Sequence, residues 1–540
     1  MAKPGLYTPD LIRDYTEKGY WNQENLSDIF DRNAALYPGK VAFVDHKACL
    51  TWSEVNEWID NTSIGLMELG LQKDSMVVVQ LPNSIEIPLL RVVGERAGVL
   101  CLPVLRSLRE REMQYILEHS GAEAVITTTE YRGFNHFQMM KELKKGLPHL
   151  KHIIVAGDVP EQPAVSLNDL SGGAYARNYS REHLAVRKYP STEYSLVLLT
   201  SGTTGLPKFV EYPSCSRLYL GRAYAESINL SQDDIVGILG PAFIGPNTTA
   251  YYGAPQVPAK TVMLQHFDVE SALDLIQKEK ITVAGLVPTQ LAMILNYPDP
   301  GKFDTGSLRV IICTGSPLPF SMALEAEKRL KTPIINFYGS VDAGGSTVHS
   351  LSDDVRIRHL TVGKPIKGVE FKLIDDSGQV TGGVGEICVR GPTMVSGYFK
   401  DPELNAASWS GDGWFKTGDY GKWDDGRLVI VGRKKDVIIR GGQNIFPAEI
   451  ENLLLTNPAV KEAALVPFPD PVMGERACAC IVFNTGMRLT FEEMTDFLKT
   501  KGIARYKLPE KVLVLDKLPK VADEQKVDKK ALIKAIAGEG

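Results

Sequence analysis

The sequence predicts an α/β protein with a large N-terminal domain, made of two α/β subdomains and a β-rich subdomain, and a small α+β C-terminal domain. Three observations predict this. The 540 residues are enough for three or four packing units at roughly 150 residues each. From about residue 53, helical and strand periods alternate, which is typical of βαβ units and a largely parallel sheet. Beyond about residue 363, short strands and turns replace that alternation.

The first α/β region opens with a helical period over residues 53–70 and a buried-type strand over 75–82. A helix over 85–98 and a strand over 99–105 repeat the pattern. The repeat continues with two further helix–strand pairs, 108–120 with 122–129 and 141–147 with 152–157. A polar stretch over about 158–193 is rich in Pro, Ser, Gly and charges, so we expect surface connections there.

A second run of apolar strands predicts the other α/β half, with a helix over 269–280 between two of them. Its strands are expected at 194–200, 261–265, 281–288, 308–315 and 333–339.

The β-rich subdomain is expected from about 363, with strand patterns within 369–391 and 426–432. The charged segment 432–436 then separates two strand patterns, and we place the domain boundary there, giving domains 1–434 and 435–540. The C-terminal domain is expected to have helices at 448–457, 491–502 and from about Asp528, with strands at 463–469, 477–483 and 511–515.

Composition excludes several classes of protein. There are 60 Lys and Arg against 65 Asp and Glu, a net charge of -5, so no global basic field indicates a partner nucleic acid or anionic membrane. Hydrophobic residues make up 44% of the chain, which argues against disorder. No stretch of 18 apolar residues and no secretory signal pattern occur, so we expect a cytoplasmic protein without a membrane span. The seven scattered cysteines are expected to be reduced and mostly buried.

Residues 198–208 carry the sharpest local signal, an apolar strand that runs into a loop of small and hydroxyl residues ending in Lys208. Small residues let backbone N–H groups point into a concave loop, and hydroxyls and an ammonium add donors for phosphate oxygens. The pattern predicts a polyphosphate site, although an ordinary strand-to-loop turn remains an alternative. Its predicted phosphate-binding residues are Thr200, Ser201, Gly202, Thr203, Thr204, Gly205 and Lys208.

Two other nucleotide motifs are excluded. No Gly-Lys pair is followed by Ser or Thr, so the loop of P-loop NTPases is missing. No G-x-G-x-x-G follows a strand, which argues against a Rossmann nicotinamide site.

Four further blocks follow the loop in order: 314–319 (TGSPLP), 336–342 (NFYGSVD), 416–423 with 431–451, and 517–532. With them, the chain resembles the adenylate-forming superfamily of acyl- and aryl-CoA ligases, peptide-synthetase adenylation domains and luciferases. The resemblance extends from about residue 20 to 536, and the N-terminal third is nearest to stand-alone aryl-acid ligases such as dihydroxybenzoate–AMP ligase.

The resemblance implies a nucleotide site. Tyr338 would stack on adenine, with other contacts from Gly315, Ser316, Pro317, Asn336, Phe337 and Gly339. Asp419 would accept both ribose hydroxyls, Arg433 would donate near the ribose, and Asp342 would hold Mg²⁺. Taken alone, Tyr338 fits a core aromatic at a strand end and Asp419 fits a turn.

The resemblance also implies a mobile C-terminal domain that serves two half-reactions. In the first half-reaction, Lys526 would stabilise charge at the triphosphate. Rotation about a hinge at Lys435 would then turn Arg440, Gly441 and Gly442 toward the active site, where they would line a tunnel for the pantetheine arm. By residue type alone, Lys526 fits a solvated surface lysine and the glycine pair fits a tight turn.

The chain departs from the family pattern at three places. Val341-Asp342 replaces the usual Thr-Glu, which puts metal placement in question, and Gln525 replaces the usual Gly before the lysine. Ile244 stands where many relatives have histidine. We expect an apolar acid pocket, with no evident Lys or Arg for a second carboxylate, lined by Phe243, Ile244, Gly245, Asn247, Thr248, Gly344 and Gly345.

The sequence therefore predicts an AMP-forming acid:thiol ligase that uses ATP, Mg²⁺ and coenzyme A. It would convert a hydrophobic acid, aromatic, alicyclic or medium-chain, to an acyl adenylate and then transfer the acyl group to coenzyme A. Alternatives are an enzyme that loads a carrier protein's phosphopantetheine, a nucleotide-binding homologue that has lost catalysis, and a luciferase-like oxygenase. We expect a monomer or a homodimer.

Overall fold

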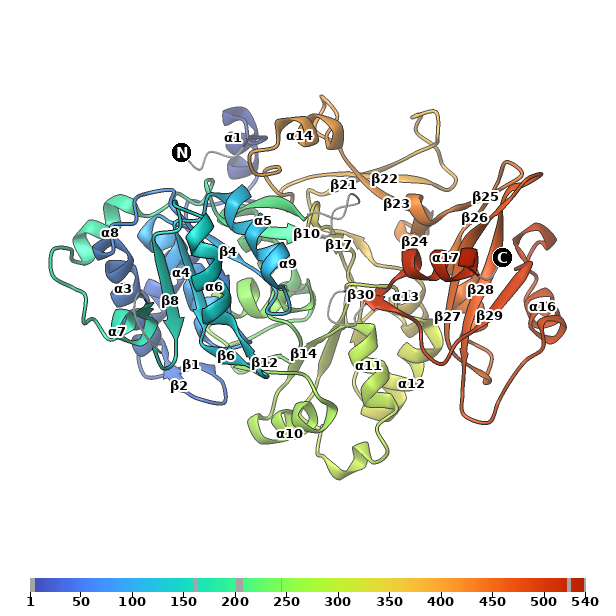
Figure 1. Ribbon diagram of the computed structural model, residues 1–540, viewed down its shortest axis with the longest axis horizontal. Helices are drawn as coiled ribbons and strands as arrows, with labels where there is room; N and C mark the ends of the chain where they lie inside the picture. The colour runs from blue at the N-terminus through green and yellow to red at the C-terminus, as the bar shows by residue number, and fades with distance from the viewer. Residues whose placement is uncertain (1–4, 160–163, 201–206, 244, 522–525, 539–540) are drawn as a thin grey trace.

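The computed structural model describes residues 5–159, 164–200, 207–243, 245–521 and 526–538. It has the predicted α/β architecture, with two seven-stranded sheets, a four-stranded sheet and a C-terminal α+β unit (Figure 1). The chain begins with helices α1 (Pro9–Glu17) and α2 (Leu26–Leu36).

The first large sheet has the order β11-β10-β4-β3-β5-β8-β9, and all its neighbours are parallel except β10 and β11. Every residue of β3 is buried, as expected for a parallel sheet covered on both faces. Its strands are β3 (Met76–Gln80), β4 (Leu100–Pro103), β5 (Ala124–Thr128), β8 (His152–Ala156), β9 (Ala164–Ser166), β10 (Tyr194–Thr200) and β11 (Lys208–Pro213). The helices are α3 (Trp52–Glu68), α4 (Glu86–Ala97), α5 (Glu110–Ser120) and α6 (His136–Gly146).

Two expectations for this region were wrong. The polar stretch 158–193 contains strand β9 and helices α7 (Leu167–Ser171) and α8 (Arg181–Arg187), and their leucines are buried. Strand β10 was expected in the second half, but it pairs with β4 of the first sheet. Periodicity identifies a strand without identifying its neighbour.

The second large sheet has the order β16-β15-β14-β12-β13-β1-β2, parallel except for β2. Strands β1, β2 and β12 were not predicted. The strands are β1 (Val41–Val44), β2 (Cys49–Thr51), β12 (Ile235–Ile238), β13 (Lys260–Met263), β14 (Val283–Leu286), β15 (Val310–Cys313) and β16 (Ile334–Ile335). Associated helices are α9 (Ser214–Ser227), α10 (Val269–Glu279), α11 (Pro288–Leu295), α12 (Phe320–Leu330) and α13 (Val355–Leu360).

The predicted β-rich subdomain is an antiparallel sheet of β21 (Glu370–Ile374), β22 (Gly385–Arg390), β23 (Phe415–Asp424) and β24 (Arg427–Arg433). Helix α14 (Pro402–Ser408) lies between β22 and β23 in the chain. A 3₁₀ turn, Lys434–Asp436, then leads to the C-terminal unit, and Lys435 within it is exposed. The boundary and hinge at this turn stay predictions.

The C-terminal unit has its own apolar core, which includes Ile438, Ile450, Leu465, Ile481 and Leu498. Its strands are β25 (Ile438–Arg440), β26 (Gln443–Ile445), β27 (Val460–Asp470), β28 (Gly474–Phe483) and β29 (Lys511–Val514). Its helices are α15 (Pro447–Leu454), α16 (Phe491–Thr500) and α17 (Lys529–Gly538), and the Asp528 carboxylate accepts from the Ala531 N–H at 3.0 Å as a cap of the last helix.

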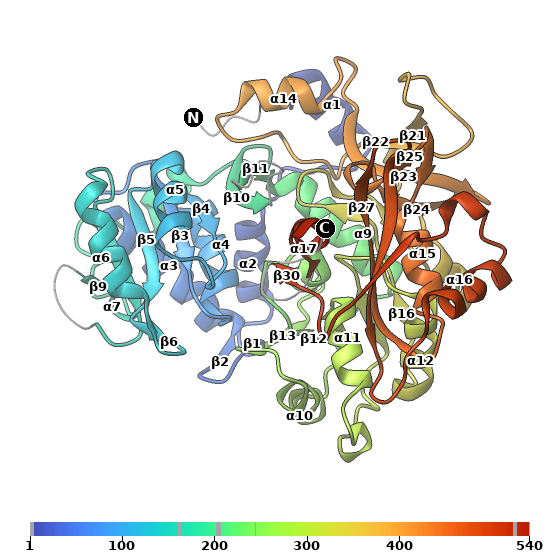
Figure 2. The same ribbon diagram turned by 45° about the vertical axis from the view of Figure 1, so that its right-hand side comes forward.

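Both ribbon views place a small hairpin of this unit, β30 (Lys520–Val521) with β31 (Lys526–Val527), toward the middle of the molecule above α11 (Figure 2). The seven cysteines all lie in the described part of the chain; six are buried and none forms a disulfide, as expected. Within the described ranges, no helix is both long and apolar enough to cross a membrane.

Candidate active site

The predicted phosphate loop joins β10 to β11. Thr200 and Lys208 pair across these strands, so the loop closes the end of a hairpin. Ser201, Gly202, Thr203, Thr204 and Gly205 lie outside the described residues. The Lys208 ammonium lies 5.1 Å from the centre of the Tyr398 ring, and this cation–π contact positions the ammonium.

Asp342 comes to the same point from a distant segment. Its carboxylate interacts with the hydroxyls of Tyr398 and Thr200 and with the charge of Lys208. Burial raises the pKa of Asp342 above its ordinary value, and these neighbours offset part of the effect. Its Oδ1 is buried and accepts no hydrogen bond from the described part of the chain. An unsatisfied carboxylate oxygen beside phosphate-type donors suits a hard cation such as Mg²⁺.

The predicted ribose residues form a second cluster. The Tyr338 hydroxyl donates to Oδ2 of Asp419 at 2.8 Å, and Arg433 Nε lies 2.9 Å from Oδ1 of the same carboxylate. Asp419 and Arg433 are cross-strand partners in β23 and β24, so the register of the sheet sets this pair. Gly418 has a φ of +71°, a conformation that glycine adopts without strain. The role of the Tyr338 hydroxyl in orienting Asp419 was not predicted.

The two segments expected to flank adenine are tied together. The Thr314 hydroxyl donates to the Phe337 carbonyl at 2.6 Å, which places Gly315, Ser316 and Pro317 beside the 336–339 segment. Gly315 has a φ of +100°, so a glycine is required at this turn. Asn336 and Tyr338 are half-buried, Phe337 is buried and Gly339 is exposed.

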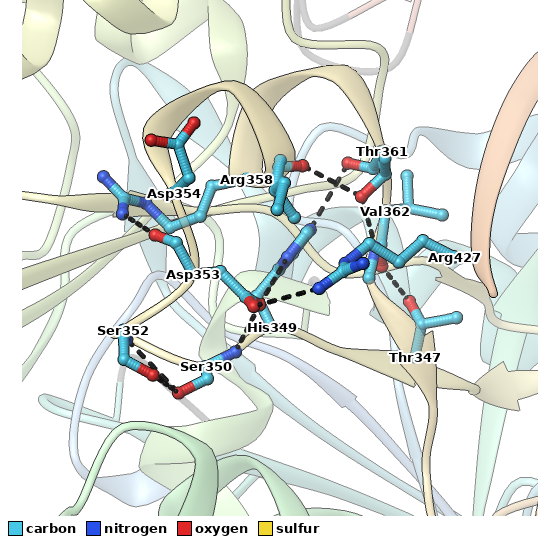
Figure 3. A network of polar contacts seen from close by, with 12 residues as sticks. Thr347, His349, Ser350, Ser352, Asp353, Asp354, Arg358, Thr361, Val362 and Arg427 are labelled. Carbon is cyan, nitrogen blue, oxygen red and sulfur yellow. Dashed lines mark hydrogen bonds and ion pairs between the residues drawn. The ribbon is translucent and has the colours of Figure 1, made fainter. Parts of the chain in front are cut away.

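A buried polar network around Thr347, His349 and Asp353 (Figure 3) connects to the backbone of Tyr338. The Tyr338 N–H donates to the Thr347 hydroxyl at 3.0 Å, and that hydroxyl donates to the Val362 carbonyl. His349 lies between the Thr361 carbonyl and Asp353, at 3.3 Å from each. Burial lowers the pKa of His349, which favours the neutral ring.

Arg427 of β24 reaches the same Asp353 at 3.5 Å, which ties the network to the sheet that carries Arg433 (Figure 3). No local sequence pattern marks these residues, because they come together only in the fold.

Gly344 and Gly345, which were expected to line the acid pocket, form the short strand β18 (Gly344–Gly345), which pairs with β17 (Gly339–Ser340). Both glycines are buried. A Cβ on Gly345 would lie 2.4 Å from the Tyr224 hydroxyl, so Tyr224 fills the space that a side chain there would take. Tyr224 in turn stacks on Phe337 with ring centres 4.1 Å apart.

The other expected pocket residues occupy the loop after β12. Phe243 stacks with Tyr251 at 6.4 Å, Thr248 is half-buried and Gly245 is exposed. Asn247 is buried and its amide donates to the Pro241 carbonyl at 2.8 Å, so it holds its own loop. Ile244 lies outside the described residues.

The C-terminal residues predicted to act in turn lie on two elements. Lys526 is in β31, where its backbone pairs with that of Val521. Arg440 makes a two-point ion pair with Glu510 at 2.9 and 3.0 Å. A Cβ on Gly442 would meet no atom within 4 Å, whereas one on Gly441 would lie 2.8 Å from Met473. Of these two glycines, Gly442 is the one that borders open space.

Comparison with known proteins decides the family. The model for AMP-binding enzymes matches residues 30–399, and the model for the C-terminal domain of AMP-binding enzymes matches residues 449–524. The chain belongs to this family. The match confirms the predicted resemblance and the predicted class of enzyme, an AMP-forming acid–thiol ligase that uses ATP.

Two relatives represent the activities found among similar sequences. The chain is 31% identical to the medium-chain fatty-acid–CoA ligase of Escherichia coli K12, over 94% of this chain and 89% of that protein. It is 30% identical to the 2,3-dihydroxybenzoate–AMP ligase of Bacillus subtilis 168, over 98% of each chain. Among solved structures, the apo form of Mycobacterium smegmatis MbtA matches with a TM-score of 0.72 at 28% identity over 98% of both chains. An anthranilate CoA ligase with bound anthranoyl-AMP, 23% identical over 96% and 98% of the chains, has the same fold with a TM-score of 0.85.

Proposed function

We propose that the protein activates a hydrophobic carboxylic acid with ATP and transfers the acyl group to coenzyme A. In the first step a carboxylate oxygen attacks the α-phosphorus and pyrophosphate leaves. In the second, the thiolate of coenzyme A attacks the acyl carbonyl and AMP leaves, while the thiol proton passes to solvent. The acid would have an aromatic, alicyclic or medium-chain body.

The observation that carries this proposal is the meeting of Thr200, Lys208 and Asp342 at one point. Asp342 lies more than a hundred positions from Thr200 and Lys208 in the chain, and the three residues offer a carboxylate, a hydroxyl and an ammonium. Tyr338 lies four residues before Asp342, and its hydroxyl donates to the Asp419 carboxylate. The segment 338–342 therefore connects the donors for phosphate to the carboxylate that would accept from a ribose diol.

Asp342 would be the protein ligand of Mg²⁺. Within the described residues, no three His, Cys, Asp or Glu side chains group into a site that could hold a metal by itself. Mg²⁺ commonly binds through one or two carboxylates together with nucleotide phosphates, so one carboxylate is sufficient here. When bound, the ion would neutralise charge on the triphosphate.

Lys526 and Gly442 would serve the two steps from the same domain. The hairpin that carries Lys526 is directed toward the middle of the molecule, the arrangement suited to adenylation (Figures 1 and 2). Gly442 borders open space in this arrangement. Rotation of the C-terminal unit at Lys435 would move Lys526 away from the active site and bring Gly442 to it.

The thiol acceptor is either coenzyme A or the phosphopantetheine of a carrier protein. Coenzyme A is supported by the E. coli relative and by a 2-hydroxy-7-methoxy-5-methyl-1-naphthoate–CoA ligase of Streptomyces carzinostaticus, 31% identical over 98% of this chain. The carrier alternative is supported by the salicyl-AMP ligase / salicyl-S-ArCP synthetase of Mycobacterium tuberculosis, 28% identical over 98% of this chain.

The test is to incubate the enzyme with ATP, Mg²⁺ and each of a panel of acids, including benzoate and octanoate, with and without free coenzyme A. We expect pyrophosphate release with at least one acid, and AMP with an acyl-CoA when the thiol is added. Pyrophosphate release without any thioester would favour a carrier protein as acceptor. No pyrophosphate release or ATP–pyrophosphate exchange with any acid would contradict the proposed function.

A further inference from the structure

Helix α9 carries a buried cation beside the expected acid pocket. Arg217 is 4% exposed. One terminal nitrogen, Nη2, donates to the Thr393 carbonyl, Nε lies 3.4 Å from the Ser216 hydroxyl, and the guanidinium lies over the Tyr212 ring at 4.6 Å. Among the described residues, no carboxylate lies within ion-pair distance of it, and Nη1 makes no hydrogen bond to them.

The other buried arginines of the described chain each have a carboxylate partner. Their ion pairs are Arg91 with Glu95 at 2.7 Å, Arg96 with Asp60 at 2.6 Å and Asp31 at 3.0 Å, and Arg358 with Glu327 at 2.8 Å. Burial of a charge without a partner is costly, and the fold avoids that cost at these three positions. Arg217 is the exception.

The position of Arg217, close to the strand β18, indicates which ligand could pair with it. A Cβ on Gly344 would lie 2.6 Å from Nη2 and 3.4 Å from Nη1 of Arg217, so both terminal nitrogens lie close to the backbone of β18. The Tyr212 hydroxyl beneath it donates to the Val341 carbonyl at 2.5 Å, next to Asp342. The free side of the guanidinium therefore adjoins the segment 341–345, which connects the phosphate residues to the acid pocket.

We propose that Arg217 binds a carboxylate of the acid substrate. This rests on the proposed function and gives its acid site a specific anion-binding group. A guanidinium has five N–H donors in a planar fork that matches the two oxygens of a carboxylate, and two of the three nitrogens are engaged here. The bound carboxylate would supply the negative charge that no described side chain places within ion-pair distance of Arg217.

The carboxylate can come from two positions on the substrate. It can be the reacting group, whose approach to the triphosphate is then eased by a cation, or a second carboxylate at the far end of a dicarboxylic acid. Sequence patterns indicated no Lys or Arg in the acid pocket, because Arg217 is 127 positions from Gly344 in the chain.

The test compares Arg217→Gln and Arg217→Lys with Arg222→Gln. Arg222 is a matched control on the same helix: it lies over the Tyr219 ring at 5.1 Å and donates to the carbonyls of Gly19 and Tyr20, away from β18. Each variant is measured with the acid pairs octanoate and suberate, and benzoate and isophthalate. The readouts are the Kd from the thermal shift that each acid produces, and the KM for the acid from pyrophosphate release.

We expect Arg217→Gln to weaken acid binding by about ten- to a hundredfold, the loss of a charged hydrogen-bonded pair, with partial recovery in Arg217→Lys and no change in Arg222→Gln. An equal loss for both members of a pair identifies the reacting carboxylate. A loss confined to suberate and isophthalate identifies a second carboxylate.

Unchanged acid affinities in Arg217→Gln would overturn the proposal, and so would a lower melting temperature with unchanged affinities, which would make Arg217 a structural residue. A wild-type protein that no acid stabilises would also overturn it. Acid binding that depends on Arg217 without pyrophosphate release would support this inference while the proposed function fails.

Discussion

Replacement of Tyr338 by Phe isolates one hydrogen bond of the nucleotide site. The substitution keeps the ring that is expected to stack on adenine and removes only the hydroxyl that donates to Asp419 at 2.8 Å. Asp419 is 6% exposed, so water does not simply replace the lost donor. The carboxylate would keep Arg433, whose side chain is half-exposed, as its remaining protein partner.

The size of the effect follows from these contacts. A hydrogen bond to a charged group contributes about 1.5–3 kcal/mol. Because Arg433 continues to orient the carboxylate, we expect the lower end, about 1.5 kcal/mol, or roughly a tenfold rise in the KM for ATP. The bond would act equally in the ground and transition states, so kcat should change less than about twofold.

The assay is pyrophosphate release at saturating acid with ATP varied. Tyr420→Phe is the matched control. Tyr420 follows Asp419 in β23, but its hydroxyl donates to Asp376 at 2.6 Å and not to Asp419. We expect the control to leave the KM for ATP unchanged. An unaltered KM in Tyr338→Phe, or the same rise in both variants, would refute the assignment of Asp419 to the ribose.

Three further predictions concern the lysine, the metal and a buried acid. Lys526→Ala should abolish adenylation yet spare thioester formation from supplied acyl adenylate, and Gly442→Trp should do the reverse; equal loss of both steps in both variants, measured as pyrophosphate and acyl-CoA formation, would contradict the two-conformation model. Because burial raises the pKa of Asp342, its carboxylate should protonate at a higher pH than an exposed aspartate, so the Mg²⁺ concentration for half-maximal rate should rise as the pH falls, and Asp342→Asn should remove that dependence. Burial raises the pKa of Glu211 from 4.5 to about 7, while the Ser396 hydroxyl donates to it at 3.1 Å. The native state then binds this proton more tightly than the unfolded state, so the associated stability is complete below about pH 4.5 and is lost as the pH rises through about 7, by up to about 3 kcal/mol. Glu211→Gln should therefore raise the melting temperature at about pH 8 much more than at about pH 5, and an equal effect at both values would refute the argument.

The sequence allowed most of the fold to be predicted because buried parallel strands are continuous apolar runs. Strand β3 and its neighbours have that character and were found. The strands that were missed are short, like β2, or interrupted by a glycine, like β12 with Gly237. The position of β10 was wrong because pairing depends on contacts between distant residues, which periodicity does not report.

The candidate site divides in the same way. Residues on recurrent motifs, such as Tyr338, Asp419 and Lys208, could be named from the sequence. Thr347 and Arg217 could not be named from the sequence. Thr347 holds the Tyr338 backbone and Arg217 lies beside Gly344, but neither Thr347 nor Arg217 belongs to a motif that would link it to the site. Helix α9 also carries Arg222 and Glu226, so nothing in its local sequence singled out Arg217.

The contacts of Arg433 and Lys434 also bear on the proposed hinge at Lys435. Arg433 is held at Asp419, and Lys434 is held at Glu386 of β22 by an ion pair of 2.6 Å, so both side chains are anchored to the β21–β24 sheet. Ile438, four positions on, is fully buried in the core of the small domain. The exposed Lys435 side chain makes no hydrogen bond or ion pair with any described residue. Backbone rotation between these anchors would disturb few contacts, which supports the proposed hinge at Lys435, and a nucleotide that engages Asp419 and Arg433 would stiffen the N-terminal side of that proposed hinge.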